Sequence, residues 1–462
     1  MYQETINKAI FDKYIKPTKS DRTRSIGIEI EMPVVNLNKA PVEETVVFEM
    51  SKAFCEHFGF VPVGLDADGN VNSMLDKSTG DDLSFDCSYS NLELSLGKGE
   101  NLFEIKKRFD KYYSFINDHF KKYNYTLTGM GVNPYCNINH NKPIPNERYR
   151  MLYHYLHSYK EHKGAETDVV FHNRPDFGTF TSVSQVQIDV YYDDLIDVIN
   201  TFGRLEPYKA MLFSNSYLPE YPDLLCSRNM LWEHSMQGYN PHNIGMFEYS
   251  LKNVDDLVDY IKSTSIYCTV RNGKYVNFTP IPINEYLHTD SVKGEYFDGE
   301  RYRTIKVVPE LDDLLYLRTF KFEDLTFRGT IEFRSSCCQP ISDSMTVAAF
   351  HIGLLENVQQ LKKLLENDTV IYSHGYSASE LQRLFSRRNI PSFTDKRKLS
   401  RRLTEILDLA ADGLKKRGHG EEVFIESLYE RASQLTNPAR KMLDGLDKGE
   451  TIERYIQEYA QI

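Results

Sequence analysis

The stretch SIGIEIEMPVV, at residues 25–35, decides the fold prediction. Its side chains alternate with a period of two, which is typical of a β-strand with one apolar face. The isoleucines share that face, so Glu29 and Glu31 project side by side from the other. Two adjacent carboxylates repel each other unless water or a cation lies between them. The pattern alone therefore leaves two interpretations open, a solvated strand face and a cation site.

Three further segments show the same two-faced alternation and predict additional strands. Their polar faces carry acids, amides or arginine: Glu93 in residues 92–96, Gln185, Gln187 and Asp189 in residues 182–191, and Glu332 and Arg334 in residues 329–334. Asp86 lies seven residues before Glu93. Carboxylates dominate these faces and lysine is almost absent, which suits a hard, oxygen-bound cation such as Mg²⁺. We therefore favour a metal cluster over a solvated sheet face.

The order of the patterns predicts an α+β fold in one large catalytic domain. Residues 1–24 are expected to form a polar helical lead-in, residues 25–462 the catalytic domain, and residues 342–462 its mainly helical C-terminal part. In that part, an apolar stripe from Val347 to Leu365 predicts one continuous helical face.

Three features within this domain favour structural roles over chemical ones. Residues 264–302 are rich in proline, glycine and tyrosine without clear periodicity, so they predict a long loop or lid. His351 falls on the apolar stripe and is expected in the core. Cys337 and Cys338 are adjacent, and since neighbours in sequence rarely pair, they are expected to be buried thiols.

The composition excludes several classes of protein. Of the 462 residues, 41% are apolar and 26% charged, and the formal net charge of −11 argues against binding to nucleic acid or to an anionic membrane. No apolar run reaches the roughly 20 residues of a membrane span. The N-terminal stretch lacks the apolar segment of a signal peptide. The seven cysteines form no CxxC pattern. These features predict a cytoplasmic globular protein.

Standard nucleotide-binding motifs are absent, because the sequence contains neither a P-loop nor a glycine fingerprint between a strand and a helix. Arg228 and Arg334 are candidate clamps for a phosphate or a carboxylate, since a guanidinium binds both in bidentate fashion. An ordinary surface or helix-cap arginine is an equally good interpretation of each residue taken singly.

Several short motifs together resemble one known family. The runs IGIEIEMP, GMGVNP, ERYRMLYHYL, SQVQID, FSNS, SRNMLW and GTIEFRSS, with Asp86 and Glu93, occur in the order of the glutamate–cysteine ligase family. They are most similar to its plant and proteobacterial branch, within the carboxylate–amine ligase superfamily, over about residues 25 to 445. The resemblance implies a glutamine-synthetase-like catalytic fold, in which a curved, largely antiparallel sheet forms a funnel with helices outside.

The resemblance also implies an activity and its partners. ATP would phosphorylate the side-chain carboxylate of glutamate, and the amine of cysteine would attack this acyl phosphate to give γ-glutamylcysteine, a step of glutathione biosynthesis. The expected partners are ATP, Mg²⁺, glutamate and cysteine, with no nucleic acid and no membrane. Two alternatives stay open: a related ligase that accepts a different amine or carboxylate, and a non-catalytic metal-binding homologue. A pair of arginine clamps argues against the second, because a metal buffer needs none.

Matching the motifs residue by residue implies a set of site residues. The metal ligands would be Glu29, Glu31, Asp86, Glu93, Gln185 and Glu332. The phosphoryl group or the carboxylates of glutamate would be held by Arg228 and Arg334, and substrate or ATP would be bound by Gln187, Asp189, Asn215 and Trp232. Gln187 departs from the branch, which usually has asparagine at this position.

Overall fold

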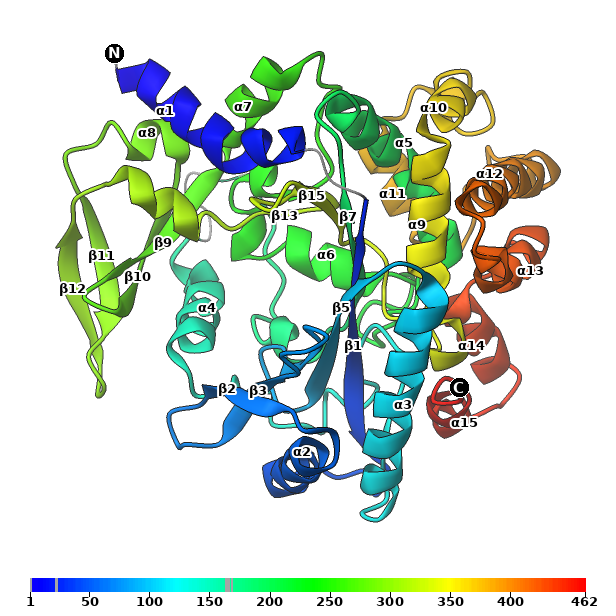
Figure 1. Ribbon diagram of the computed structural model, residues 1–462, viewed down its shortest axis with the longest axis horizontal. Coiled ribbons are helices and arrows are strands. Elements are labelled where there is room, and N and C mark those ends of the chain that lie inside the picture. The colour runs from blue at the N-terminus through cyan, green and yellow to red at the C-terminus, as the bar shows by residue number, and fades with distance from the viewer. Residues whose placement is uncertain (1, 21–23, 163–166, 168) are drawn as a thin grey trace.

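The computed structural model describes every residue except 1, 21–23, 163–166 and 168, and its centre is a large antiparallel sheet (Figure 1). The strand order is β14 (Glu323–Leu325), β15 (Thr330–Phe333), β7 (Ser184–Asp189), β1 (Ile26–Asn36), β5 (Asn91–Gly99), β4 (Asp82–Phe85), β3 (Val71–Leu75) and β2 (Val61–Leu65), and β6 (Tyr125–Leu127) pairs with the far end of β1. The four strands predicted from the sequence are the consecutive neighbours β15, β7, β1 and β5. Their shared polar face therefore extends across four adjacent strands.

The apolar face of these strands forms the main core. Ile26, Ile28, Ile30 and Met32 of β1 are all buried there. Helix α3 (Leu102–Lys121) packs on β5 and β6, and helix α9 (Thr346–Glu356) packs on β7. Other helices surround the sheet: α2 (Glu44–Phe58) on α3, α5 (Leu195–Phe213), α6 (Ser227–Glu233) and α7 (Val254–Ser263). The α+β class and the largely antiparallel sheet are thus confirmed, while the funnel shape stays a prediction.

The C-terminal part is helical, as the sequence predicts, and lies to one side of the sheet (Figure 1). After α9 come α10 (Val358–Glu366), α11 (Ala378–Phe385), α12 (Lys396–Arg417), α13 (Glu426–Gln434), α14 (Pro438–Leu446) and α15 (Ile452–Glu458). Helix α12 packs directly on α9, where a Cβ at Gly413 would meet the carbonyl oxygen of Gly353.

The single helical face predicted from Val347 to Leu365 is divided between two helices. Asn357 separates α9 from α10, and its side-chain amide donates to Leu409 O at 2.7 Å and to Asp412 Oδ2 at 3.0 Å. These bonds tie the break to α12. His351 is fully buried in α9, as predicted, and burial holds its pKa well below the usual range.

The N-terminal segment is helical and packs into the main core. Helix α1 (Tyr2–Ile10) continues in irregular helical turns to Lys19 and packs on α7 and on the turn at Leu311–Tyr316. Ile6 and Ile10 are fully buried, so the segment has an apolar stripe that the expectation of a polar lead-in overlooked.

The prediction of a long loop at residues 264–302 is wrong. The segment belongs to a second antiparallel sheet of β9 (Ser265–Arg271), β10 (Lys274–Pro282), β11 (Val292–Phe297) and β12 (Tyr302–Val307), with the short helix α8 (Ile283–Tyr286) between β10 and β11. Strand β9 shows no alternation because its first five residues are all buried. Asn272 and Gly273 both have positive φ in the β9–β10 turn, and Asn-Gly is a hairpin signal that the sequence does contain.

Two elements connect this second sheet to the centre. Helix α4 (Glu147–His157) packs on β10, and the short strands β8 (Ile244–Gly245) and β13 (Phe320–Lys321) form a parallel pair. In the part of the chain that the structure describes, no helix combines the length and hydrophobicity that crossing a membrane requires.

Candidate active site

A cavity of about 510 Å³ lies on the polar face of the central strands. Its walls carry five carboxylates and four arginines, and no lysine or histidine among the described residues. The charged residues are Glu29, Glu31, Asp86, Glu93, Glu332, Arg148, Arg228, Arg328 and Arg334. Such a mixture can hold metal ions and polyanions together.

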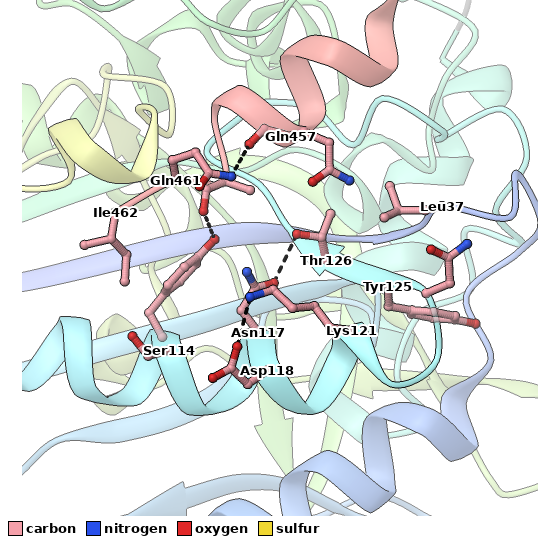
Figure 2. A pocket seen from close by; sticks show the side chains of 13 residues that line it. Leu37, Ser114, Asn117, Asp118, Lys121, Tyr125, Thr126, Gln457, Gln461 and Ile462 are labelled. Atoms are coloured by element: carbon pink, nitrogen blue, oxygen red, sulfur yellow. Dashed lines mark hydrogen bonds and ion pairs between the residues drawn. The ribbon is translucent and has the colours of Figure 1, made fainter.

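A second cavity of similar size, about 550 Å³, lies between α3, β6 and the C-terminal residues (Figure 2). Among the described residues it contains one carboxylate, Asp118, which pairs with Lys121 at 2.9 Å. Its other polar groups bond mainly to one another, as in the 3.0 Å bond from Thr126 Oγ1 to Asn117 Oδ1. Charge therefore distinguishes the two cavities, and volume does not.

Three carboxylates converge at one end of the charged cavity. Glu31 of β1 lies directly opposite Glu93 of β5, and Asp86 follows β4 in a tight turn. Burial raises the pKa of Glu93 to about 7, with the neighbouring Asp86 as a further cause. Burial and then Asp86 and Glu93 raise the pKa of Glu31 well above its usual range. A cation entering between these acids would remove the repulsion.

Helix α4 and the backbone hold Asp86 in place. Tyr149 donates from its hydroxyl to Asp86 Oδ1 at 3.2 Å. The next residue, Cys87, has a φ of 61°, an unusual conformation for a side chain other than glycine, and its carbonyl accepts from Ile144 N at 2.8 Å. Arg148 opposes the rise that burial imposes on the pKa of Asp86.

The other end of the cavity contains Glu29 and Glu332. Gln185, directly opposite Glu29 in the sheet, donates to Glu29 Oε2 at 3.1 Å. Gln187, opposite Glu332, donates to Glu29 Oε1 at 2.7 Å and to Glu332 Oε1 at 3.4 Å. Burial, followed by the charges of Glu93 and Glu332, raises the pKa of Glu29 well above its usual range.

The two predicted arginines lie together. Arg228, in the first turn of α6, donates from Nη1 to the carbonyl oxygen of Arg334 at 3.0 Å. Arg334 donates to Glu332 Oε2 at 2.8 Å, and its guanidinium lies 5.0 Å from the centroid of the Phe320 ring. Arg228 is 6% exposed, which makes it a fixed cation in the cavity wall.

Aromatic rings form the wall beside these arginines. Trp232 of α6 stacks on Phe320 of β13 with ring centroids 4.3 Å apart, and Phe177 meets Trp232 edge-on at 4.7 Å. Trp232 and Phe320 line the cavity, so its wall is apolar on this side.

Ten of the twelve predicted site residues line the cavity, and two do not. Asp189 shares the strand face of Gln187, but it lies at the end of β7, where its Oδ2 accepts from Ser25 N and Oγ at 2.9 and 2.6 Å. Asn215 is buried and does not line the cavity, and its amide donates to the carbonyls of Gly129 and Cys338 at 2.7 and 2.8 Å. Both side chains thus bond within the protein and are not among the residues that line the cavity, so their contact with substrate stays a prediction.

Three cavity residues that carry a charge or bond to a cavity acid were not predicted. Arg148 and Tyr149 occupy the first turn of α4, and Arg328 lies in the turn before β15. Tyr149 and Arg148 stand within ERYRMLYHYL, a run whose helical pattern gives no sign that its first turn faces an acid cluster. Arg328 precedes Glu332 by four residues, and this pair of opposite charges close in sequence is the signal that could have placed Arg328 near the cavity.

Comparison with known proteins gives relatives at low identity. No family model matches the chain. The chloroplastic glutamate–cysteine ligase of Brassica juncea is 25% identical over 289 residues, which cover 59% of this chain and 52% of that protein. The Arabidopsis thaliana enzyme is 24% identical over 56% of this chain and 48% of its own length. The chain thus spans about half the length of these curated relatives.

A solved structure matches over almost the whole chain. The glutamate–cysteine ligase of Francisella tularensis, in complex with AMP, superposes with a TM-score of 0.51 at 12% identity, covering 96% of this chain and 88% of that one. The chain is similar to glutamate–cysteine ligases in sequence and in fold. The resemblance that the sequence motifs indicated is therefore confirmed. The plant relatives are chloroplastic by name, so a cytoplasmic location stays a prediction.

The fit of a metal differs between the two ends of the charged cavity. Among the described residues, no three acidic, histidine or cysteine side chains are grouped closely enough to hold a metal ion as they stand. At the Glu31, Asp86 and Glu93 end, mutual repulsion of buried oxygens is the environment that a divalent cation stabilises. At the Glu29 and Glu332 end, amide and guanidinium donors already occupy the carboxylate oxygens.

Proposed function

We propose that the protein is an ATP-dependent ligase that joins the side-chain carboxylate of glutamate to the amine of cysteine. The observation that carries the proposal is one cavity in which five carboxylates and four arginines come together on adjacent strands of a fold similar to that of a glutamate–cysteine ligase. Carboxylates for metal and arginines for phosphate oxygens are what phosphoryl transfer requires, because the protein mainly has to neutralise charge.

The reaction would proceed in two steps. The carboxylate of glutamate attacks the terminal phosphorus of ATP, and ADP leaves, which gives a γ-glutamyl phosphate. The amine then attacks the acyl carbon, phosphate leaves, and the amine proton passes to solvent or to a neighbouring carboxylate. When bound, Mg²⁺ would neutralise the phosphate oxygens, and Glu31, Asp86 and Glu93 are the residues that would hold it.

The chain's own residues would position both substrates. Arg228 and Arg334 lie side by side, and Arg334 already bonds to a carboxylate through one N–H, which leaves a guanidinium plane suited to phosphate or acyl phosphate oxygens. The wall of Trp232 and Phe320 would exclude water, which hydrolyses acyl phosphates.

The decisive experiment measures ADP release by the purified chain with Mg²⁺, ATP, glutamate and a panel of amines that includes cysteine. Glutamate labelled with ¹⁸O in its side-chain carboxylate should transfer one labelled oxygen to phosphate, because that oxygen bridges carbon and phosphorus in the intermediate. Glu31→Gln should abolish ADP release, and Glu405→Gln, a surface control on α12, should not. ADP release that does not depend on an amine or a carboxylate substrate would refute the proposal.

A further inference from the structure

The side chain of Gln187 lies between two carboxylates of the cavity. In the sheet it is opposite Glu332 of β15 on one side and Gly27 of β1 on the other. Its Nε2 donates to Glu29 Oε1 at 2.7 Å and to Glu332 Oε1 at 3.4 Å, while its Oε1 accepts from Arg328 Nη2. One amide group thus connects two acids to one arginine.

The partners fix the orientation of this amide. An amide has one end that only donates and one that only accepts, and a carboxylate can only accept while a guanidinium can only donate. Reversing the amide would point its oxygen at Glu29 and Glu332 and its nitrogen at Arg328. Acceptors would then face acceptors, and donors would face donors. The NH₂ group of Gln187 therefore faces the two acids, and Arg328 polarises the amide from behind.

All four oxygens of Glu29 and Glu332 accept a hydrogen bond from the protein itself. Gln187 bonds one oxygen of each, Gln185 bonds the second oxygen of Glu29, and Arg334 bonds the second oxygen of Glu332. A divalent cation at this position would have to displace these donors.

The opposite end of the cavity differs. Within the described part of the chain, hydrogen bonds reach only one oxygen each of Glu31, Asp86 and Glu93. The donors are neutral groups, including the backbone N–H of Val183 at 3.1 Å and the hydroxyl of Ser95 at 2.6 Å. Oxygens without protein donors therefore concentrate at this end.

We propose that Gln187, oriented by Arg328, takes the place of a divalent cation between Glu29 and Glu332, so that tight metal binding is confined to the Glu31, Asp86 and Glu93 end. Gln187 is then a positioning residue that holds two acids together without metal. The proposal rests on the proposed function only in treating the cavity as a metal site, and it replaces the expectation that Glu29 and Glu332 are metal ligands with one that the ion count below tests.

The test counts Mn²⁺ ions bound by the full chain without nucleotide, from the loss of the free-ion signal in electron paramagnetic resonance. Gln187→Glu replaces the amide by a third carboxylate and should bind one more tight Mn²⁺ per chain than the wild type. The matched control is Gln359→Glu, because Gln359 also donates to a carboxylate, Asp197 at 3.0 Å, but on the surface. The added site should bind at least about tenfold more tightly than any ion gained by the control.

Equal numbers of tight ions in the wild type and in Gln187→Glu would overturn the proposal. If that variant does not fold, Gln187→Asn supplies the test, since an amide shorter by one methylene reaches only one of the two acids. Mn²⁺ should then raise the melting temperature more in Gln187→Asn than in the wild type, and an equal rise would overturn the proposal.

The ion count is independent of turnover. If the wild type releases ADP but binds as many tight ions as Gln187→Glu, the proposed ligase activity is kept and the role of Gln187 is refuted. If Gln187→Glu binds one more tight ion than the wild type but the wild type releases no ADP, the role of Gln187 is kept and the ligase activity is refuted.

Discussion

Replacing Arg334 by lysine should separate a role in catalysis from a role in stability. Lysine keeps a positive charge beside Glu332, whose Oε2 lies 2.8 Å from Nη1, but it loses the planar fork and the stacking on Phe320. The lost cation–π contact amounts to about 1 kcal/mol. In a chain of this length that lowers the melting temperature by about 2 °C or less.

The expected effect on rate is much larger. A guanidinium has five N–H donors, and the bond to Glu332 uses one, so the others are available to the transferring phosphoryl group. An arginine that stabilises this charge contributes about 10³-fold or more to turnover, equivalent to roughly 4 kcal/mol of barrier. We therefore expect Arg334→Lys to reduce ADP release about 10³-fold.

Both quantities are measured on one preparation, by coupled ADP release and by thermal unfolding. The control is Arg402→Lys, because Arg402 also pairs with a buried carboxylate, Asp368 at 3.0 Å, and its side chain is 14% exposed against 20% for Arg334. This variant should lose stability without losing turnover. Wild-type turnover in Arg334→Lys would remove the residue from the catalytic machinery, and a fall in melting temperature alone would make it structural.

Three further predictions follow from the site and its surroundings. Glu31→Gln should raise the melting temperature of the metal-free protein, since burial and then the charges of Asp86 and Glu93 disfavour the ionised form of Glu31, and it should abolish the stabilisation by Mg²⁺; a lower melting temperature without metal would contradict this reasoning. Asn215→Ala should cost about 2–4 kcal/mol of unfolding free energy, because it leaves two buried carbonyl oxygens without a hydrogen-bond donor, and it should leave KM values unchanged. A large change in KM with normal stability would show that Asn215 contacts substrate. Burial lowers the pKa of Lys321 to about 8, so above pH 8 the unfolded chain keeps a proton that the folded chain has lost. The free energy of unfolding of the wild type should therefore rise relative to that of Lys321→Met by up to about 3 kcal/mol as the pH approaches 10.5. Parallel plots of stability against pH for the two proteins would refute this.

The polar face of the sheet could be predicted because strand periodicity is a local property. Glu29 and Glu31 must point the same way whatever surrounds them, and antiparallel neighbours with the same pattern bring Glu93 beside Glu31. Periodicity does not show how far the cavity extends along a strand. Asp189 therefore lies on the correct face of β7 but at its end, where Ser25 binds it.

Residues that reach the cavity from helices and turns could not be predicted in this way. Arg148 faces the acids only because α4 is docked against the second sheet, where His154 stacks on Tyr302 at 3.6 Å and Glu147 pairs with Lys274 at 3.3 Å. These contacts join segments more than 120 residues apart, and the sheet that provides them was interpreted as a loop. Local sequence patterns therefore could not predict the position of α4 or of Arg148.

The stacking of Trp232 on Phe320 has a practical consequence, because Trp232 is the only tryptophan in the chain. Indole emission can be excited selectively over the 31 tyrosines, so all of the fluorescence collected in this way comes from the wall of one cavity. A nucleotide or an amine that enters beside Arg334 changes the surroundings of that ring and therefore the intensity or wavelength of its emission. Ligand affinities, and the order in which ligands bind, can thus be measured by titrating the unlabelled wild-type protein.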